Sequence, residues 1–138
     1  MNASTSPAAS LRDSGKEAQA GRLESRHTTR ALIEQFNACW AEHDLDAALA
    51  LLSEDCVFDA TSPAPDGTRV VGPAAIRDLW EPIFADADSR FAAEEVLVAT
   101  DHVVQRWRYE WRDGHVRGID LITTAEGRIT SKLSYVKG

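Results

Sequence analysis

The sequence has few cysteines, no long apolar run and no excess of basic residues. Its two cysteines, Cys39 and Cys56, both lie in apolar stretches. Neither a disulfide framework nor a cysteine metal site follows from two such residues, which are typical of small buried side chains. No apolar run approaches the roughly 18 residues of a membrane-spanning helix, and residues 1–27 lack the apolar core of a secretory signal. We therefore expect a cytoplasmic protein.

Basic residues are also outnumbered: 15 Lys and Arg stand against 22 Asp and Glu, for a net charge of −7. Phosphate recognition requires clustered Lys and Arg, so this balance argues against nucleic acid and against an anionic membrane surface as partners. The four histidines show no metal-ligand spacing, and no glycine-rich phosphate loop occurs. We expect neither a metal nor a cofactor.

The length and composition fit one folded domain behind a short tail. Of the 138 residues, 43% are hydrophobic, which is enough for a core. Residues 1–27 are rich in Ala, Ser, Gly and charge, and they have few large apolar side chains. We expect a disordered tail over 1–27 and a small-molecule pocket domain over 28–138.

The hydrophobic pattern changes from helical to alternating along the chain. Helical spacing predicts helices over 28–43, 45–52 and 73–84, with Asp44 capping the second and Pro73 opening the third. Alternation predicts strands over 56–60, 70–71, 90–99, 102–112, 115–124 and 129–136. Helices first and a long antiparallel meander last indicate an α+β fold, with the helices on one face of a curved sheet.

Two turn signals allow a prediction of strand register. Asp113-Gly114 and Glu126-Gly127 are both typical of two-residue hairpins, and directly paired residues share a face of the sheet. The resulting pairs include Trp107 with Asp120, and Asp120 with Leu133. The predicted inner face is almost entirely apolar: Trp107, Tyr109, Trp111, Val116, Gly118, Asp120, Ile122, Ile129, Leu133 and Tyr135. Lys132 falls on the predicted outer face.

Asp120 is the one charged residue of that inner face. Because no Lys or Arg shares the face, desolvation disfavours the charged carboxylate, and we expect a protonated acid. Such a group can donate to an oxyanion or act as a general acid. The alternative is a structural Asp120 tied by tyrosine hydroxyls or helix backbone. Tyr109 and Tyr135 flank Gly118, whose missing side chain leaves room for a ligand or for the two rings.

Aromatic side chains are numerous for so small a domain. We expect an apolar oxygenated ligand to contact the following residues: Trp40, Phe58, Trp80, Phe84, Trp107, Gly118 and Leu133. For Trp40, Trp80 and Phe84, plain core packing is the alternative. The second acid, Asp59, lies near the end of the first predicted strand and faces either the pocket or solvent.

Several stretches resemble one known superfamily. They are Gly118-Ile119-Asp120-Leu121-Ile122, Glu126-Gly127-Arg128-Ile129, Ser134-Tyr135, His43-Asp44-Leu45-Asp46 and Gly72-Pro73-Ala74-Ala75-Ile76. Together they resemble the SnoaL-like polyketide cyclases and ketosteroid isomerases of the nuclear transport factor 2-like superfamily. The resemblance implies a cone-shaped, mixed sheet with three N-terminal helices on its concave face, as in cystatin-like rolls.

The resemblance also implies site roles, not all of which fit. Asp120 falls where isomerases keep the protonated oxyanion-hole Asp and where cyclases place an acid/base Asp. The isomerase tyrosine falls on Phe36, and the general base falls on Ala60, one residue after Asp59. Arg117 has the wrong strand parity for an epoxide hydrolase.

These features predict a cofactor-independent isomerase, aldol-type cyclase or dehydratase that uses Asp120, Tyr109, Tyr135 and Asp59. The alternative is a non-catalytic ligand-binding or dimerisation module of the same fold. Superfamily members often associate through the outer sheet face, so we expect a homodimer.

Overall fold

Helices precede most of the sheet in the chain, as expected for the α+β class. The computed structural model describes residues 7–138, with side chains from residue 15 onward. The elements of this part of the chain are α1 Pro7–Ala41, α2 Leu45–Ala50, β1 Leu52–Asp59, β2 Arg69–Val71, α3 Pro73–Ala85, β3 Arg90–Val98, β4 His102–Trp111, β5 Gly114–Ala125 and β6 Arg128–Val136.

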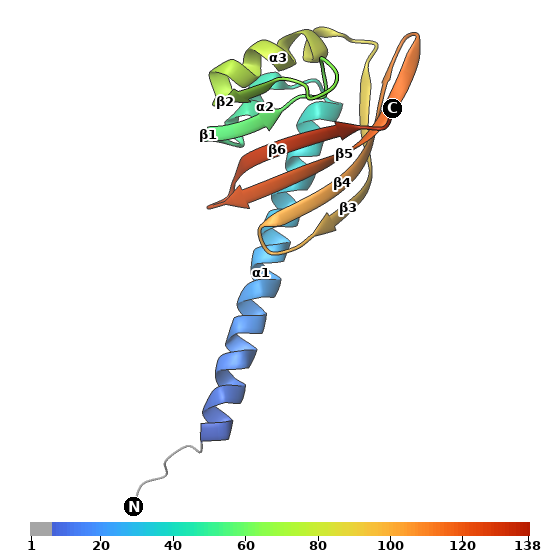
Figure 1. The fold of residues 1–138 in the computed structure, drawn as a ribbon. Coiled ribbons are helices and arrows are strands. Elements are labelled where there is room, and N and C mark those ends of the chain that lie inside the picture. Colours follow the sequence, from blue (N-terminus) through green and yellow to red (C-terminus); the bar gives the residue numbers. More distant parts are fainter. Residues whose placement is uncertain (1–6) are drawn as a thin grey trace, which may run out of the picture.

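The six strands form one mixed sheet in the order β2-β1-β6-β5-β4-β3. Every neighbouring pair is antiparallel except β1 and β6, which run parallel. The three helices lie on one face of the curved sheet (Figure 1). The predicted α+β fold, a mixed sheet with three helices, is confirmed.

Helix α1 is much longer than the sequence pattern predicted. It begins at Pro7 instead of near residue 28, so residues 7–27 are helical and not a disordered tail. Residues 15–28 are exposed, and this part of the helix projects away from the sheet (Figure 1). Because Ala, Glu, Arg and Leu favour helix and propagation costs less than nucleation, a helix anchored by the core extends outward. Residues 1–6 of the expected tail lie outside the described residues.

The predicted N-terminal ends of α2 and α3 are confirmed. Asp44 Oδ1 accepts a hydrogen bond from Ala47 N at 3.1 Å, which caps α2. Gly72, with φ of 91°, precedes α3, and Pro73 occupies its first turn. Only glycine adopts that φ readily, which explains the Gly-Pro pair at this point of the chain.

The core lies between the helices and the sheet. Its fully buried large side chains are Ile33, Phe36, Ile76, Trp80, Val103, Ile122 and Ile129. Cys39 and Cys56 are free and buried, which confirms their expected role as small apolar side chains.

Cys56 should make the protein less stable in alkali. Burial, with a further contribution from Asp55, raises the pKa of the Cys56 thiol from 9.0 to about 12. Between these values the unfolded chain releases the thiol proton while the folded chain keeps it. The free energy of unfolding should therefore fall across this window, by up to about 1.4 kcal/mol per pH unit.

Urea unfolding at a series of pH values would measure this slope. Cys56→Ala should flatten it in part, because burial also raises the pKa of Cys39 and that thiol acts in the same direction. An unchanged slope in the variant would contradict the assignment to Cys56.

Candidate functional site

The hairpin of β4 and β5 differs from the prediction in strand register, but its side chains lie on the predicted faces of the sheet. Trp111 pairs with Gly114, so the turn is Arg112-Asp113, and Trp107 pairs with Gly118 instead of Asp120. Neither turn residue has a positive φ, so the turn does not need Gly114, which lies instead against the Trp111 ring. The pairing is offset by two residues, and an even offset leaves every side chain on its predicted face. Asp120 and Trp107 are accordingly both buried.

The second hairpin contains a β-bulge that the sequence pattern did not reveal. The turn at Glu126-Gly127 is confirmed, with positive φ at both residues. Thr124 pairs with Ile129, but the next residue, Thr123, pairs with Ser131, so Thr130 is an extra residue in β6. The Thr123 hydroxyl lies 2.7 Å from that of Thr130.

This bulge reverses the facing of β6 beyond Thr130. A one-residue insertion moves each later side chain to the opposite face. The predicted inward positions of Leu133 and Tyr135 are therefore wrong, and Tyr135 is 56% exposed. In their place Lys132 and Ser134 face the helices, opposite Ile122 and Asp120.

Asp120 is completely buried and is surrounded by hydrogen-bond donors. Its Oδ1 accepts from Ser134 Oγ at 2.7 Å, Trp107 Nε1 at 2.9 Å and Lys132 Nζ at 3.4 Å. Its Oδ2 accepts from Gln105 Nε2 at 3.2 Å. The premise of the sequence-based expectation, that no cation shares the face of Asp120, is wrong, because Lys132 Nζ lies 3.4 Å from Asp120 Oδ1.

Lys132 is the residue that presents charge to the pocket. It is only 7% exposed, and its Nζ donates to Ser134 Oγ at 2.9 Å. The same atom lies 5.0 Å from the centre of the Phe58 ring and 5.5 Å from that of Trp40. Both distances are within the range of cation–π attraction.

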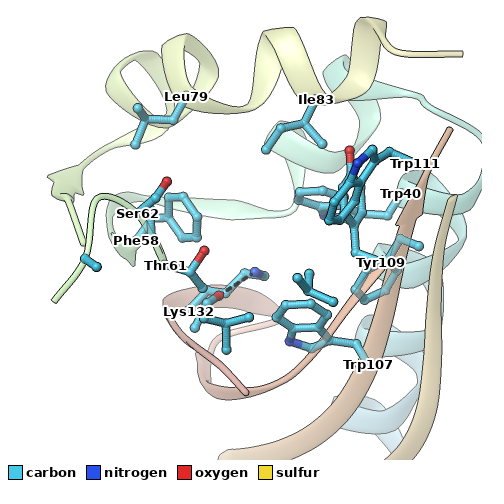
Figure 2. A pocket seen from close by; sticks show the side chains of 16 residues that line it. Trp40, Phe58, Thr61, Ser62, Leu79, Ile83, Trp107, Tyr109, Trp111 and Lys132 are labelled. Carbon is cyan, nitrogen blue, oxygen red and sulfur yellow. Dashed lines mark hydrogen bonds between the residues drawn. The ribbon is translucent and has the colours of Figure 1, made fainter. Parts of the chain in front are cut away.

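These groups form the floor of an apolar cavity of about 520 Å³. Figure 2 shows Lys132 and Trp107 on one side of the cavity and Leu79 and Ile83 of α3 on the other. The lining residues are Trp40, Phe58, Ala60, Thr61, Ser62, Ala64, Leu79, Ile83, Phe91, Trp107, Tyr109, Trp111, Val116, Lys132, Ser134 and Val136. Asp120 does not line the cavity but lies behind Lys132, Ser134 and Trp107.

The structure brings together only part of the predicted site. Trp40, Phe58, Trp107 and Tyr109 line the cavity. Trp80 and Phe84 are buried core residues instead.

The other predicted site residues lie elsewhere. Leu133 and Tyr135 face away from the cavity. Asp59 forms a two-point ion pair with Arg69, with Nη2 to Oδ2 at 3.1 Å and Nε to Oδ1 at 3.3 Å.

Sequence reasoning missed Lys132, Ser134 and Gln105. The inward facing of Gln105 was predictable from the sequence, since this residue shares the strand parity of Trp107 and is a polar residue on an apolar face. It is fully buried and links Asn37 of α1 to Asp120, accepting from Asn37 Nδ2 at 2.8 Å. No comparable signal marks Lys132 and Ser134, because their facing depends on the bulge.

Gly118 has a structural role beneath Trp107. A Cβ at this position would lie 2.4 Å from Trp107 Cζ2 and 2.2 Å from the Tyr135 carbonyl oxygen. Gly118→Ala should therefore destabilise the fold by about 1–3 kcal/mol and displace Trp107 from Asp120. Urea unfolding and the near-ultraviolet circular dichroism of the indole rings would measure both effects.

Gly21 of α1 provides the matched control for Gly118. A Cβ there meets nothing within 4 Å, so Gly21→Ala should be neutral or slightly stabilising. Equal effects of the two substitutions would contradict the proposed clash.

Two further site types are absent from the described part of the chain. Residues 7–138 include no helix with both the length and the apolar character needed to cross a membrane. Among these same residues, no three His, Cys, Asp or Glu side chains gather as metal ligands.

A curved mixed sheet with three helices on one face and a cavity lined by aromatic rings defines a fold of the nuclear transport factor 2-like class. The model of the SnoaL-like domain family matches residues 33–132. The chain therefore belongs to the SnoaL-like domain family. None of the curated proteins compared matches it.

Solved structures agree with this assignment. An NTF2-like protein of unknown function from Mesorhizobium loti is 40% identical, with a TM-score of 0.76 over 82% of this chain and 93% of its own. A candidate ketosteroid isomerase from Kribbella flavida is 15% identical, with a TM-score of 0.72 over 82% and 80%. A candidate polyketide cyclase from Xanthomonas campestris is 19% identical, with a TM-score of 0.65 over 82% and 93%. The last two similarities show the fold alone.

Proposed function

We propose that this protein binds an apolar small molecule carrying a carbonyl-type oxygen, and that Lys132 Nζ contacts that oxygen. The observation that carries the proposal is a single ammonium group on the floor of a mostly apolar cavity. Apolar pockets with a few convergent polar groups are typical of small-molecule sites.

Lys132 has a hydrogen bond available for such a ligand. An ammonium group has three N–H donors, and two of them are directed to Ser134 and Asp120. Because Lys132 lines the cavity, the remaining donor is free to meet a ligand oxygen. The rings of Trp40, Phe58 and Trp107 then enclose the apolar body of the ligand.

This arrangement suits a cofactor-independent isomerase, aldol-type cyclase or dehydratase. Each of these reactions passes through an enolate, whose oxygen a fixed ammonium group stabilises in a dry site. In this proposal the oxyanion role expected of Asp120 passes to Lys132, and Asp120 becomes the residue that positions it. Epoxide hydrolysis is disfavoured, since Arg117 pairs with Glu94 outside the cavity at 3.1 Å.

A second candidate is binding without catalysis, and one observation favours it. The cavity lining, all of which falls within the described residues, includes no carboxylate and no imidazole that could act as a general base. In a catalytic mechanism the substrate proton would pass to Ser134 Oγ while Ser134 gives its own proton to the Asp120 carboxylate.

Proton exchange in heavy water would separate these candidates. An apolar ketone such as tetralone would be incubated with the protein, and proton NMR would follow deuterium uptake beside the carbonyl. Catalysis predicts exchange that Lys132→Met abolishes and that the exposed-lysine control Lys137→Met retains. Saturable binding without exchange would support the second candidate, and absence of binding would refute the proposal.

We also propose association into a homodimer through the outer sheet face. Ile119, Leu121 and Tyr135 are exposed there on paired strands, with exposed fractions of 39%, 40% and 56%. Leu121→Glu should convert a dimer to a monomer in light scattering, and a monomeric parent protein would exclude the assembly. A cytoplasmic location remains the expectation from the sequence.

A further inference from the structure

We infer that the ligand is an organic anion, whose anionic oxygen pairs with Lys132 at the floor of the cavity. The inference rests on the proposed binding function and adds the charge of the ligand. Neutral apolar molecules of the same shape are then not the preferred ligands.

The Asp120 carboxylate accepts hydrogen bonds from several donors. Three donors other than Lys132 already reach this carboxylate, from Ser134, Trp107 and Gln105, at 2.7–3.2 Å. The Lys132 contact, at 3.4 Å, is the longest of the four. Asp120 therefore has its hydrogen bonds without Lys132, whereas Lys132 keeps donor capacity that Asp120 does not use.

The ion pair of Lys132 and Asp120 is oriented relative to the cavity. Asp120 has no exposed surface, whereas Lys132 lines the cavity. The pair is thus a dipole whose positive end faces the ligand space. In a mostly apolar cavity this field is screened less than it would be in water.

No other charged residue of the cavity lining competes with Lys132. Lys132 is the only charged residue among the sixteen that line the cavity. The chain as a whole has a net charge of −7, so its general field repels anions. Selection of an anion must therefore come from Lys132, and a variant without this ammonium group should lose it.

The rings around Lys132 indicate the rest of the ligand. Trp40 and Phe58 hold the ammonium group by cation–π contacts, and Trp107 completes the floor. Flat apolar bodies pack well against such rings. The ligand class is therefore an aromatic or alicyclic skeleton with a carboxylate or an ionised enol.

Two fluorescent probes with the same skeleton test the charge. Anilinonaphthalene sulfonate is anionic, and N-phenylnaphthylamine is its neutral counterpart. We expect the anionic probe to bind the parent protein at least about tenfold more tightly, as for a charge-assisted hydrogen bond. The preference should be retained in Lys137→Met, whose lysine is exposed at the chain end.

The decisive variant is the double substitution Lys132→Met with Asp120→Asn. Removing both charges avoids leaving a buried carboxylate without its cation. The neutral probe should bind as before, and the preference for the anion should disappear. Near-ultraviolet circular dichroism would verify that the variant keeps its packed rings.

Two further measurements test whether the probes bind inside the cavity. The first is Val116→Trp, which places a large ring in the cavity, and the second is competition between the probes. Both probes should lose affinity in the filled variant, and each should displace the other from the parent protein. Anion binding that survives in Val116→Trp, or equal affinity of the two probes, would overturn the inference. Equal affinity would leave the proposed function intact, whereas absence of binding by both probes would refute that function itself.

Discussion

Replacing Asp120 with alanine should destabilise the protein by about 3–5 kcal/mol, because it leaves a buried ammonium group without its counter-ion. The side chain of Lys132 is 8% exposed and that of Asp120 is not exposed at all. The variant also removes the acceptor of Trp107 Nε1, Ser134 and Gln105. Urea unfolding followed by circular dichroism would measure the loss.

Asp59 is the matched control, since it is the other acid that the sequence marked as a site candidate. Its ion pair with Arg69 lies at the surface, where the Arg69 side chain is 62% exposed. Solvent screens such pairs, so Asp59→Ala should change stability far less than Asp120→Ala. Equal losses in the two variants would contradict the buried network.

Trp80→Ala should cost a similar amount, about 3–5 kcal/mol, for a different reason. Trp80 is completely buried. Its ring centre lies 5.0 Å from that of Trp40 and 5.4 Å from that of Phe58. Removal of this ring leaves a cavity that the surrounding side chains cannot fill.

Two comparisons separate this packing role from a ligand contact. Trp80→Phe should be much milder, since it keeps a ring and removes an indole N–H that has no hydrogen-bond partner among the described residues. Trp111→Ala, at the 38% exposed edge of the cavity, should affect ligand affinity more than stability. A large stability loss in Trp111→Ala with a small one in Trp80→Ala would reverse these assignments.

The family places few limits on the reaction. The 40% identical relative is itself of unknown function, and the relatives described as a candidate isomerase and a candidate cyclase share only the fold. Function must therefore be argued from the side chains that line the cavity. In this chain Lys132 lines the cavity and Asp120 lies behind it.

The local sequence pattern was sufficient to predict most helices and strands and the inward-facing residues of β4 and β5. Alternation along β4 and β5 placed Trp107, Asp120 and Ile122 inside, and the buried state of all three agrees. The prediction withstood an incorrect turn because the error in register was even. Side-chain facing within a strand depends only on parity, which a sequence displays directly.

Three features were not predictable from the local sequence pattern. The bulge at Thr130 is a property of the pairing of β6 with β5, and no residue type announces it. The extension of α1 to Pro7 follows from a helix already anchored on the core. Trp80 and Phe58 both read as apolar, and only packing placed one in the core and the other on the cavity wall.

The sequence by itself thus determined a SnoaL-like α+β fold and a buried acid at Asp120, since both follow from periodicity and local motif. Only the tertiary structure decided that Lys132 stands between this acid and the cavity. The physical reason is that one extra residue in a paired strand reverses every side chain beyond it, and that insertion is visible only once the strands are paired.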